Sequence, residues 1–448
     1  MSLTDEEFRT KLEKHFSLYR INLRSPLVSP IIPNHWYRVD LLLVNELGLF
    51  RRADIEPDGQ VIVTCDLFTP NHKESITPFQ TQDRDWEIEI RSCHAFSEGR
   101  LSKERMPVPG FVQSGKGAFE YRVRSKHHSK QGQQKRFIHI KASKLVQFPK
   151  GDKTTHNEDM ILPLVVGPIE IISDTTTSSD FDKEEKSSIT NLPLELWDPN
   201  EIKDMIHDGY RVFSVATSSS SCDPPLNNIA IHEMWDSGIP GKIWDSALVM
   251  LDFIKNMIKL RPDYIQGKHT LDLSAGTGLL GFYVAASMIE SSSKQGQITI
   301  TELGDAVDLI NKNGKINNFL LLSNQQLQTK SLLWGNRKEA EACGKADLIL
   351  ASDVLYESQF FEDLVKTFVD LSTSETRIYI GYKRRGFDEA EEQRFWSLCS
   401  HYFDVKLLDY EDKKDEDHIL VPQLILKETN VQLYRLLPRT KLSSLSPF

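Results

Sequence analysis

The segment Leu271-Asp-Leu-Ser-Ala-Gly-Thr-Gly-Leu-Leu280 constrains the fold of this chain more than any other part of the sequence. Its first three residues are typical of the end of a buried strand, and the apolar run from Leu279 onward is typical of a helix. Between them, Gly276 and Gly278 allow a tight turn without side chains. A strand that runs through a glycine turn into a helix begins a Rossmann-like fold, in which a backbone loop contacts a ligand at the carboxyl edge of a parallel sheet.

The residues around this turn favour S-adenosylmethionine (AdoMet) over NAD as the ligand. The strand ends in an acid, Asp272, which could reach the ammonium end of AdoMet. A full G-x-G-x-x-G is absent because Ser274 stands first, and AdoMet has no pyrophosphate that would need such a loop. The next acidic strand end, Glu302, follows at about the spacing at which these folds place a ribose-binding carboxylate. An isolated glycine turn and an ordinary surface acid remain the alternatives.

The second half of the chain alternates strands and helices, which predicts a mainly parallel sheet covered on both faces. We expect a Rossmann-like α/β domain over residues 191–448. The last two predicted strands have no predicted helix between them, so we expect an antiparallel hairpin there. The predicted strands are Thr270–Ser274, Gln297–Glu302, Gln326–Leu332, Ala346–Ser352, Arg377–Tyr382, Phe403–Tyr410 and Val431–Leu436, and the predicted helices are 279–290, 304–317, 358–371 and 388–400.

The first half of the chain has short apolar runs of strand length separated by turn residues, a pattern that predicts an all-β, sandwich-like domain over residues 25–172. We expect a helix over residues 1–24 and a flexible linker over the polar residues 173–190. The predicted strands are Trp36–Val44, Gln60–Phe68, Trp86–Ser92, Ala118–Ser125, Lys135–Ala142 and Leu162–Ile172.

Several of the predicted strand ends in the second half carry residues suited to a ligand, and such ends meet at one edge of the sheet. Asp353 could hold an incoming ammonium, and Tyr356 would add an aromatic wall and a hydroxyl; a helix cap and a core tyrosine are the alternatives. Trp334 could contact an adenine or belong to the core. Trp244, just before an amphipathic helix, could cover a cofactor.

Six motifs in this order resemble those of the class I, seven-strand AdoMet-dependent methyltransferases, and more narrowly methyltransferase family 16, which modifies lysines of proteins. The match covers about residues 227–437. The motifs are Ile243-Trp-Asp-Ser-Ala247, Leu271 to Gly281, Thr301-Glu-Leu303, Trp334-Gly335, Asp353-Val-Leu-Tyr356 and Tyr382-Lys-Arg-Arg385.

The resemblance implies an AdoMet-dependent protein-lysine methyltransferase whose substrate is a chaperone, an ATPase or a translation factor. It implies that Asp353 and Tyr356 shape the entry of the lysine and act in catalysis. Two residues depart from the family pattern: Ser274 replaces its first glycine, and Glu302 replaces its usual Asp. The residues that it implies for AdoMet binding are Trp244, Asp272, Ser274, Gly276, Gly278, Glu302, Trp334 and Ser352.

Composition excludes several kinds of partner and site. A net charge of −10 and a pI of about 5.8 argue against adhesion of the whole chain to nucleic acid or to an anionic membrane. The five cysteines are scattered and none forms a C-x-x-C pair, so neither a disulfide framework nor a metal site is expected. No apolar run is long enough for a membrane span. We expect a monomer located in the cytoplasm or the nucleus.

Two basic segments leave alternatives open. Arg122–Lys144 holds eight Lys or Arg residues, three histidines and no acid. It could grip the phosphates of nucleic acid, recruit an acidic protein, or be a solvated hairpin. Lys383-Arg384-Arg385 could be a docking surface for an acidic protein or a solvated strand end. The alternative to an enzyme is a nucleic-acid-binding or regulatory protein that uses a degenerate methyltransferase fold as a scaffold.

Overall fold

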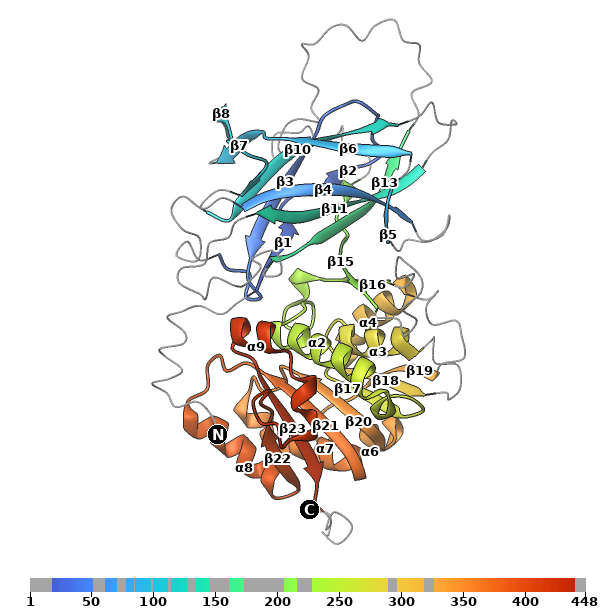
Figure 1. Ribbon diagram of the computed structural model, residues 1–448, viewed down its shortest axis with the longest axis vertical. Helices are drawn as coiled ribbons and strands as arrows, with labels where there is room; N and C mark the ends of the chain where they lie inside the picture. Colours follow the sequence, from blue (N-terminus) through green and yellow to red (C-terminus); the bar gives the residue numbers. More distant parts are fainter. Residues whose placement is uncertain are drawn as a thin grey trace, which may run out of the picture. The chain divides into compact units, whose positions relative to one another are not determined.

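The structure is a computed structural model, and it divides into two compact units, Leu18–Val212 and a unit formed mainly by Phe213–Phe448. It describes residues 18–50, 61–70, 78–83, 85–97, 100–111, 114–126, 134–144, 161–172, 205–215, 228–288, 296–317 and 326–439. The predicted linker and most of the predicted N-terminal helix lie outside the described residues. Each unit is shown in Figure 1.

The N-terminal unit is all-β, as predicted. Its longer strands are close to the predicted ones because the alternation of apolar and polar residues marks half-buried strands. Their order in the sheet is β12-β1-β3-β10-β9-β4-β11-β13-β15, with β5 beside β4 and β6 beside β10. Those strands are β1 (Tyr19–Leu23), β3 (Tyr37–Val44), β4 (Val61–Pro70), β5 (Pro78–Gln82), β6 (Trp86–Arg91), β9 (Gly110–Phe111), β10 (Lys116–Ser125), β11 (Gln134–Lys144), β12 (Ile161–Leu162), β13 (Leu164–Ile171) and β15 (Gly209–Ser214).

One core holds this unit together. Strands from different parts of the sheet contribute to a single cluster of buried side chains. Its fully buried members include Val39 on β3, Phe119 on β10, Ile138 on β11 and Val166 on β13. Four short strands complete the unit: β2 (Leu27–Val28), β7 (His94–Ser97), β8 (Arg100–Arg105) and β14 (Met205–Ile206). Burial of these apolar side chains is what stabilises the unit.

The boundaries of this unit differ from the predicted ones at both ends. Residues 19–23 form strand β1, which pairs with β3, where a helix over residues 1–24 was predicted. The apolar residues Tyr19 and Ile21 are fully buried in the β core, and this burial outweighs helical propensity. After the linker, β14 pairs with β2 and β15 pairs with β13, so residues 205–212 belong to this unit and not to the α/β domain.

The C-terminal unit has a seven-stranded sheet with the order β19-β18-β17-β20-β21-β23-β22. All neighbouring pairs from β19 to β21 are parallel, and β23 runs antiparallel to both of its neighbours. This confirms the Rossmann-like prediction. The strands are β17 (His269–Leu273), β18 (Gln297–Glu302), β19 (Gln326–Ser331), β20 (Ala346–Ser352), β21 (Ser372–Tyr382), β22 (Phe403–Leu407) and β23 (Gln432–Pro438).

Helices cover both faces of this sheet, with α2, α3 and α4 on one face and α6, α7 and α8 on the other (Figure 1). The predicted terminal hairpin is wrong in one respect: a 3-10 helix, η8 (Glu416–Leu420), and helix α9 lie between its two strands. The helices are α2 (Asp245–Leu260), α3 (Leu279–Met288), α4 (Gly304–Ile316), α6 (Arg337–Cys343), α7 (Phe361–Leu371), α8 (Glu389–Ser400) and α9 (Gln423–Thr429).

The order of the strands fixes where a ligand can bind. The chain leaves β17 toward β18 and β19 on one side, then crosses to β20 and β21 on the other, so the direction of winding reverses between β17 and β20. In open α/β sheets, ligands bind outside the carboxyl ends of the strands at this reversal. Among the described residues, no helix combines the length and apolar content that a membrane crossing needs.

Candidate active site

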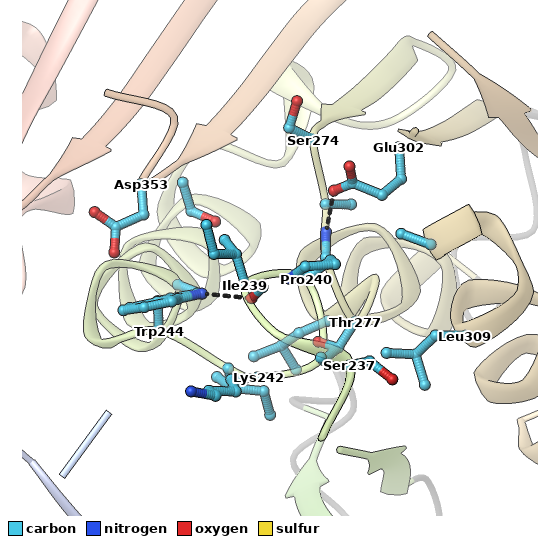
Figure 2. A pocket seen from close by; sticks show the side chains of 18 of the residues that line it. Ser237, Ile239, Pro240, Lys242, Trp244, Ser274, Thr277, Glu302, Leu309 and Asp353 are labelled. Carbon is cyan, nitrogen blue, oxygen red and sulfur yellow. Dashed lines mark hydrogen bonds between the residues drawn. The ribbon is translucent and has the colours of Figure 1, made fainter. Parts of the chain in front are cut away.

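A cavity of about 690 Å³ lies at the carboxyl ends of β17, β18 and β20. Its opposite wall is the loop that connects β16 (Asn228–His232) to α2. Its volume is typical of small-molecule sites. Figure 2 shows Glu302 and Asp353 on opposite sides of the cavity, with the Trp244 indole beneath Asp353. The predicted site residues that line the cavity are Trp244, Ser274, Gly276, Glu302, Ser352, Asp353 and Tyr356.

The turn after β17 has the backbone conformation that its glycines predict, and it also places a serine in that conformation. Ser274 has φ of 54° and Gly276 has φ of 55°, both in the left-handed region. A non-glycine residue there costs about 1 kcal/mol or more. The Ser274 hydroxyl accepts a hydrogen bond of 2.9 Å from the indole N–H of Trp334. The serine therefore fastens the turn to the segment that follows β19.

Glu302 closes the turn from the end of β18. One carboxylate oxygen accepts the backbone N–H of Gly276 at 2.9 Å, and the other accepts the backbone N–H of Leu303 at 2.9 Å. Burial raises the pKa of this carboxyl, and the two backbone N–H groups oppose the rise. Each oxygen keeps a further lone pair. The carboxylate can therefore accept hydrogen bonds from a pair of hydroxyls on a ligand in the cavity.

Three of the predicted cofactor residues stand behind the cavity wall and do not line it: Asp272, Gly278 and Trp334. Gly278 has φ of 81°, and a Cβ there would lie 2.7 Å from the Phe282 ring, so the glycine is required by packing. Trp334 supports the turn through Ser274 and packs beside Tyr356, with ring centroids 5.7 Å apart. The pattern of residues at strand ends predicted that these residues lie near the ligand. It could not distinguish residues that line the cavity from residues that support the lining.

Asp272 supports the start of helix α3. One of its oxygens accepts the backbone N–H of Gly281 at 2.8 Å. Among the described residues, none donates a hydrogen bond to its other oxygen, Oδ1. Burial raises the pKa of this carboxyl to about 7, against the lowering effect of the Gly281 N–H. Asp272 is therefore a buried carboxyl behind the glycine turn, and its Oδ1 atom has no hydrogen-bond donor among the described residues.

The loop before α2 forms the second wall. The Trp244 indole N–H donates to the backbone carbonyl of Ile239 at 3.0 Å, which holds the ring flat against the loop. The Lys242 ammonium lies 5.9 Å from the Trp244 ring centroid. Gly241 is required here because a Cβ would lie 2.0 Å from the Met234 carbonyl oxygen. Trp244 lines the cavity, and its role as a cover of the cofactor stays a prediction.

The third wall belongs to Asp353, which follows β20 with φ of 59°. Its backbone N–H donates to the Gly381 carbonyl at 2.8 Å, so this strained residue is fixed to the neighbouring strand β21. Its carboxylate is 6% exposed and is paired with the Arg385 guanidinium. Tyr356 is 44% exposed and forms part of the rim.

For two residues of the basic strand end Lys383-Arg384-Arg385, both the docking prediction and the solvated alternative are wrong. Lys383 is mostly buried and pairs with the buried carboxylate of Asp245 at 2.7 Å. Arg384 is 4% exposed and lies 3.7 Å from the buried carboxylate of Glu392. Acids brought from other elements neutralise these cations, which the sequence alone could not pair.

Sequence reasoning missed the roles of two further residues, Arg385, which it named only as part of a motif and of the basic strand end, and Asn313. Arg385 lines the cavity and lies with its guanidinium carbon 4.8 Å from the Trp244 ring centroid. Asn313, on α4, is fully buried and donates to the carbonyls of His232 at 3.1 Å and Thr277 at 2.9 Å. An asparagine inside a helix was the available signal, because Asn is unfavourable there unless its amide is used.

The residues of this cavity fit AdoMet. The glycine turn leaves no Cβ at Gly276, where one would lie 3.2 Å from the Pro240 carbonyl oxygen. Glu302 supplies acceptors for ribose hydroxyls, and Trp244 and Leu309 offer apolar surface. Among the described residues, no group of three His, Cys, Asp or Glu side chains could hold a metal ion.

Known proteins with similar sequences match the part of the chain that carries this cavity. The family model described as lysine methyltransferase matches residues 225–401. Protein N-lysine methyltransferase METTL21A of Xenopus tropicalis is 28% identical over 208 residues, which are 46% of this chain and 88% of the relative. EEF1A lysine methyltransferase 3 of Xenopus tropicalis is 26% identical over 219 residues, 49% of this chain and 88% of the relative. The part of this chain that carries the cavity is therefore similar in sequence to the lysine methyltransferases.

Proposed function

We propose that this protein transfers a methyl group from AdoMet to a lysine side chain of a protein, with a translation factor, a chaperone or an ATPase as the substrate. The single observation that carries the proposal is the cavity at the carboxyl edge, where Glu302 and the glycine turn lie on one side and Asp353 on the other. The relatives support the class of substrate, since EEF1A lysine methyltransferase 3 is named for a translation factor.

The chain's residues divide the work by position. The glycine turn and Glu302 would hold the nucleoside part of AdoMet, and Trp244 would cover it. When bound, AdoMet supplies an electrophilic methyl group on a positive sulfonium. Asp353 and Tyr356 would align the acceptor amine with that group, and alignment supplies much of the rate.

Asp353 orients the amine and does not act as a strong base. A lysine ammonium, with a pKa near 10.4, must lose a proton before it can attack. The positive sulfonium of bound AdoMet and the apolar surroundings would lower the pKa of the incoming amine. The proton then leaves to solvent.

The test uses the full chain with radiolabelled AdoMet and a cell lysate. The labelled protein band is hydrolysed, and its amino acids are separated. We expect label in N-methylated lysine, and far less label with the Asp353→Asn variant. Label in another amino acid, or equal labelling by the variant, would contradict the proposal.

Nucleic-acid binding through Arg122–Lys144 stays a prediction, and the comparisons do not favour the scaffold alternative. Residues 127–133 of this segment lie outside the described residues. In the described part, Arg122 and Arg124 pair with Glu89 at 2.7 and 3.1 Å, and Lys141 pairs with Asp66 at 2.8 Å. These pairs reduce the positive charge offered to phosphates. Salt-dependent retention of the protein on duplex DNA or RNA would test the prediction.

We also propose that the protein works in the cytoplasm or the nucleus. The support is chemical: Cys65, Cys93, Cys343 and Cys399 are free thiols, and reducing compartments keep thiols in this state. Imaging of the tagged full chain in cells tests the proposal, and accumulation in a secretory compartment would contradict it.

A further inference from the structure

The Arg385 guanidinium occupies the position that an acceptor ammonium would need. It pairs with the Asp353 carboxylate, donates to the Lys383 carbonyl at 3.1 Å, and lies over the Trp244 ring at 4.8 Å. A carboxylate, a carbonyl and an aromatic face are also the contacts that stabilise a lysine ammonium. A substrate lysine that approaches Asp353 therefore competes with a cation of the protein itself.

Displacement of Arg385 has a cost that depends on what the substrate offers in return. The Arg385 side chain is only 28% exposed. Water therefore solvates its guanidinium incompletely once a substrate ammonium pairs with Asp353 in its place. A partly buried charge that loses its partner destabilises the complex. The cost falls if the substrate brings a carboxylate of its own beside the lysine, because two ion pairs then replace one.

The other cations of the cavity favour the same occupant. Lys242 lies on the same wall as Trp244, with its ammonium 5.9 Å from the ring centroid, so a substrate carboxylate beside Trp244 meets a second positive charge. Lys312, which also lines the cavity, is matched there by Asp308. On the acidic side of the cavity, the Glu302 carboxylate already accepts two backbone N–H groups. The apolar side chains of Ile239 and Tyr356, 56% and 44% exposed, would contact the aliphatic parts of the same segment.

We propose that Arg385 is a specificity-determining residue that selects acceptor lysines flanked by an Asp or Glu side chain. The inference rests on the proposed function, since it assumes that the acceptor amine enters beside Asp353. The exchange replaces one ion pair with two: the substrate ammonium pairs with Asp353, and Arg385 pairs with the substrate carboxylate. A lysine with neutral neighbours leaves Arg385 in place and is rejected.

Binding of two matched peptides to the full chain tests this exchange without methyl transfer. The probes are dye-labelled acetyl-Ala-Glu-Lys-Glu-Ala-amide and acetyl-Ala-Gln-Lys-Gln-Ala-amide, followed by fluorescence anisotropy. We expect the Glu peptide to bind roughly three- to tenfold tighter, the range for one partly exposed ion pair. The chain has a net charge of −10, so general electrostatics opposes this preference.

The variants assign the preference to one side chain. In Arg385→Gln the two peptides should bind within about twofold of each other, and Arg385→Lys should restore part of the preference. Arg394→Gln, a matched change on α8 at an arginine that is 52% exposed and pairs with Glu362, should leave it unchanged.

Three results would overturn the inference: equal affinity of the two peptides for the wild-type chain, no measurable binding of either peptide, or an unchanged preference in Arg385→Gln. AdoMet binding and lysate labelling are measured separately on the same proteins. If the protein neither binds AdoMet nor labels a protein in the lysate, but still prefers the Glu peptide, the result counts against the proposed function alone.

Discussion

Two residues at the carboxyl edge of the sheet have strained backbone conformations, and contacts with neighbouring residues hold them there. Asp353 and Ser274 both have positive φ without being glycine, and such strain persists only where the surroundings enforce it. Asp353 is fastened to β21 through its backbone and to Arg385 through its carboxylate. Ser274 is fastened to Trp334. The predictions at this scale change Asp353, Ser274 and the buried Asp272.

Asp353→Asn tests the orienting role. Asparagine tolerates the left-handed backbone conformation better than alanine does, so this variant removes the charge and keeps the fold. We expect kcat/KM for methyl transfer to fall by about 100-fold because the amine loses its alignment. AdoMet affinity, measured by calorimetry, should stay within about threefold, since other residues hold the cofactor. Full turnover by the variant would rule out the role.

Ser274 offers a paired comparison of strain and hydrogen bonding. Ser274→Ala keeps the Cβ at positive φ and loses the bond to Trp334, so it should destabilise the unit by about 1–2 kcal/mol. Ser274→Gly loses the same bond but relieves about 1 kcal/mol of backbone strain. Urea unfolding should therefore rank glycine above alanine, and the reverse order would contradict the account.

Asp272 predicts a pH dependence with a definite sign. Its pKa is about 7 in the folded unit, above the usual value near 3.9. A raised carboxyl pKa means that folding takes up a proton, so the unfolding free energy falls as pH rises from about 4 to about 7. Between pH 5 and pH 8, the titration of Asp272 should lower the free energy of unfolding by about 2–3 kcal/mol.

Asp272→Asn should lack that part of the pH dependence, because an asparagine oxygen can still accept the Gly281 N–H without titrating. Urea unfolding of both proteins at pH 5 and pH 8 isolates the contribution, since the other groups titrate in both. Identical losses in the two proteins would show that Asp272 does not carry the raised pKa.

Among the elements, β16 and α4 are joined by two asparagines one helical turn apart. Asn317 exchanges hydrogen bonds of 2.9 and 2.8 Å with the backbone of Ala230, and Asn313 accepts the His232 N–H at 2.8 Å. Asn313 also reaches the Thr277 carbonyl in the glycine turn. One helix thereby sets the distance between both walls of the cavity.

Asn313→Ala should leave buried backbone groups unpaired and cost about 2–4 kcal/mol of stability. It should also weaken AdoMet binding, because the loop before α2 and the glycine turn lose their common tether. Asn311→Ala, two residues away on the exposed face of α4, is the matched control and should change neither quantity. Thermal unfolding and calorimetry measure the two effects. An AdoMet affinity equal to that of the control would contradict the tether.

The elements that sequence reasoning found are those with strong local patterns. β10 and β17 were predicted within about two residues because alternation and apolar runs mark strands. The short strand β9 and the seven-residue helix α6 were missed, since neither is long enough to show periodicity. β1 was missed because its residues follow a segment with helical character, and only its tertiary partners make it a strand.

For the whole molecule, the sequence predicted two units and the edge where the cavity lies, because motif order fixes topology. It could not predict which side chains pair across elements, such as Asp353 with Arg385 or Asp245 with Lys383, which are 32 and 138 positions apart. The first pairing sets the charge at one wall of the cavity, which Asp353 and Arg385 both line, and the second buries Lys383 against helix α2.

The central claim is that the cavity between Glu302 and Asp353 binds AdoMet. The most direct measurement is calorimetric titration of the full chain with AdoMet, together with a Glu302→Ala variant. We expect saturable binding at one site per chain, weakened at least about tenfold in the variant by loss of the buried acceptor. An absence of binding heat at several temperatures, or equal affinity in the two proteins, would contradict the claim.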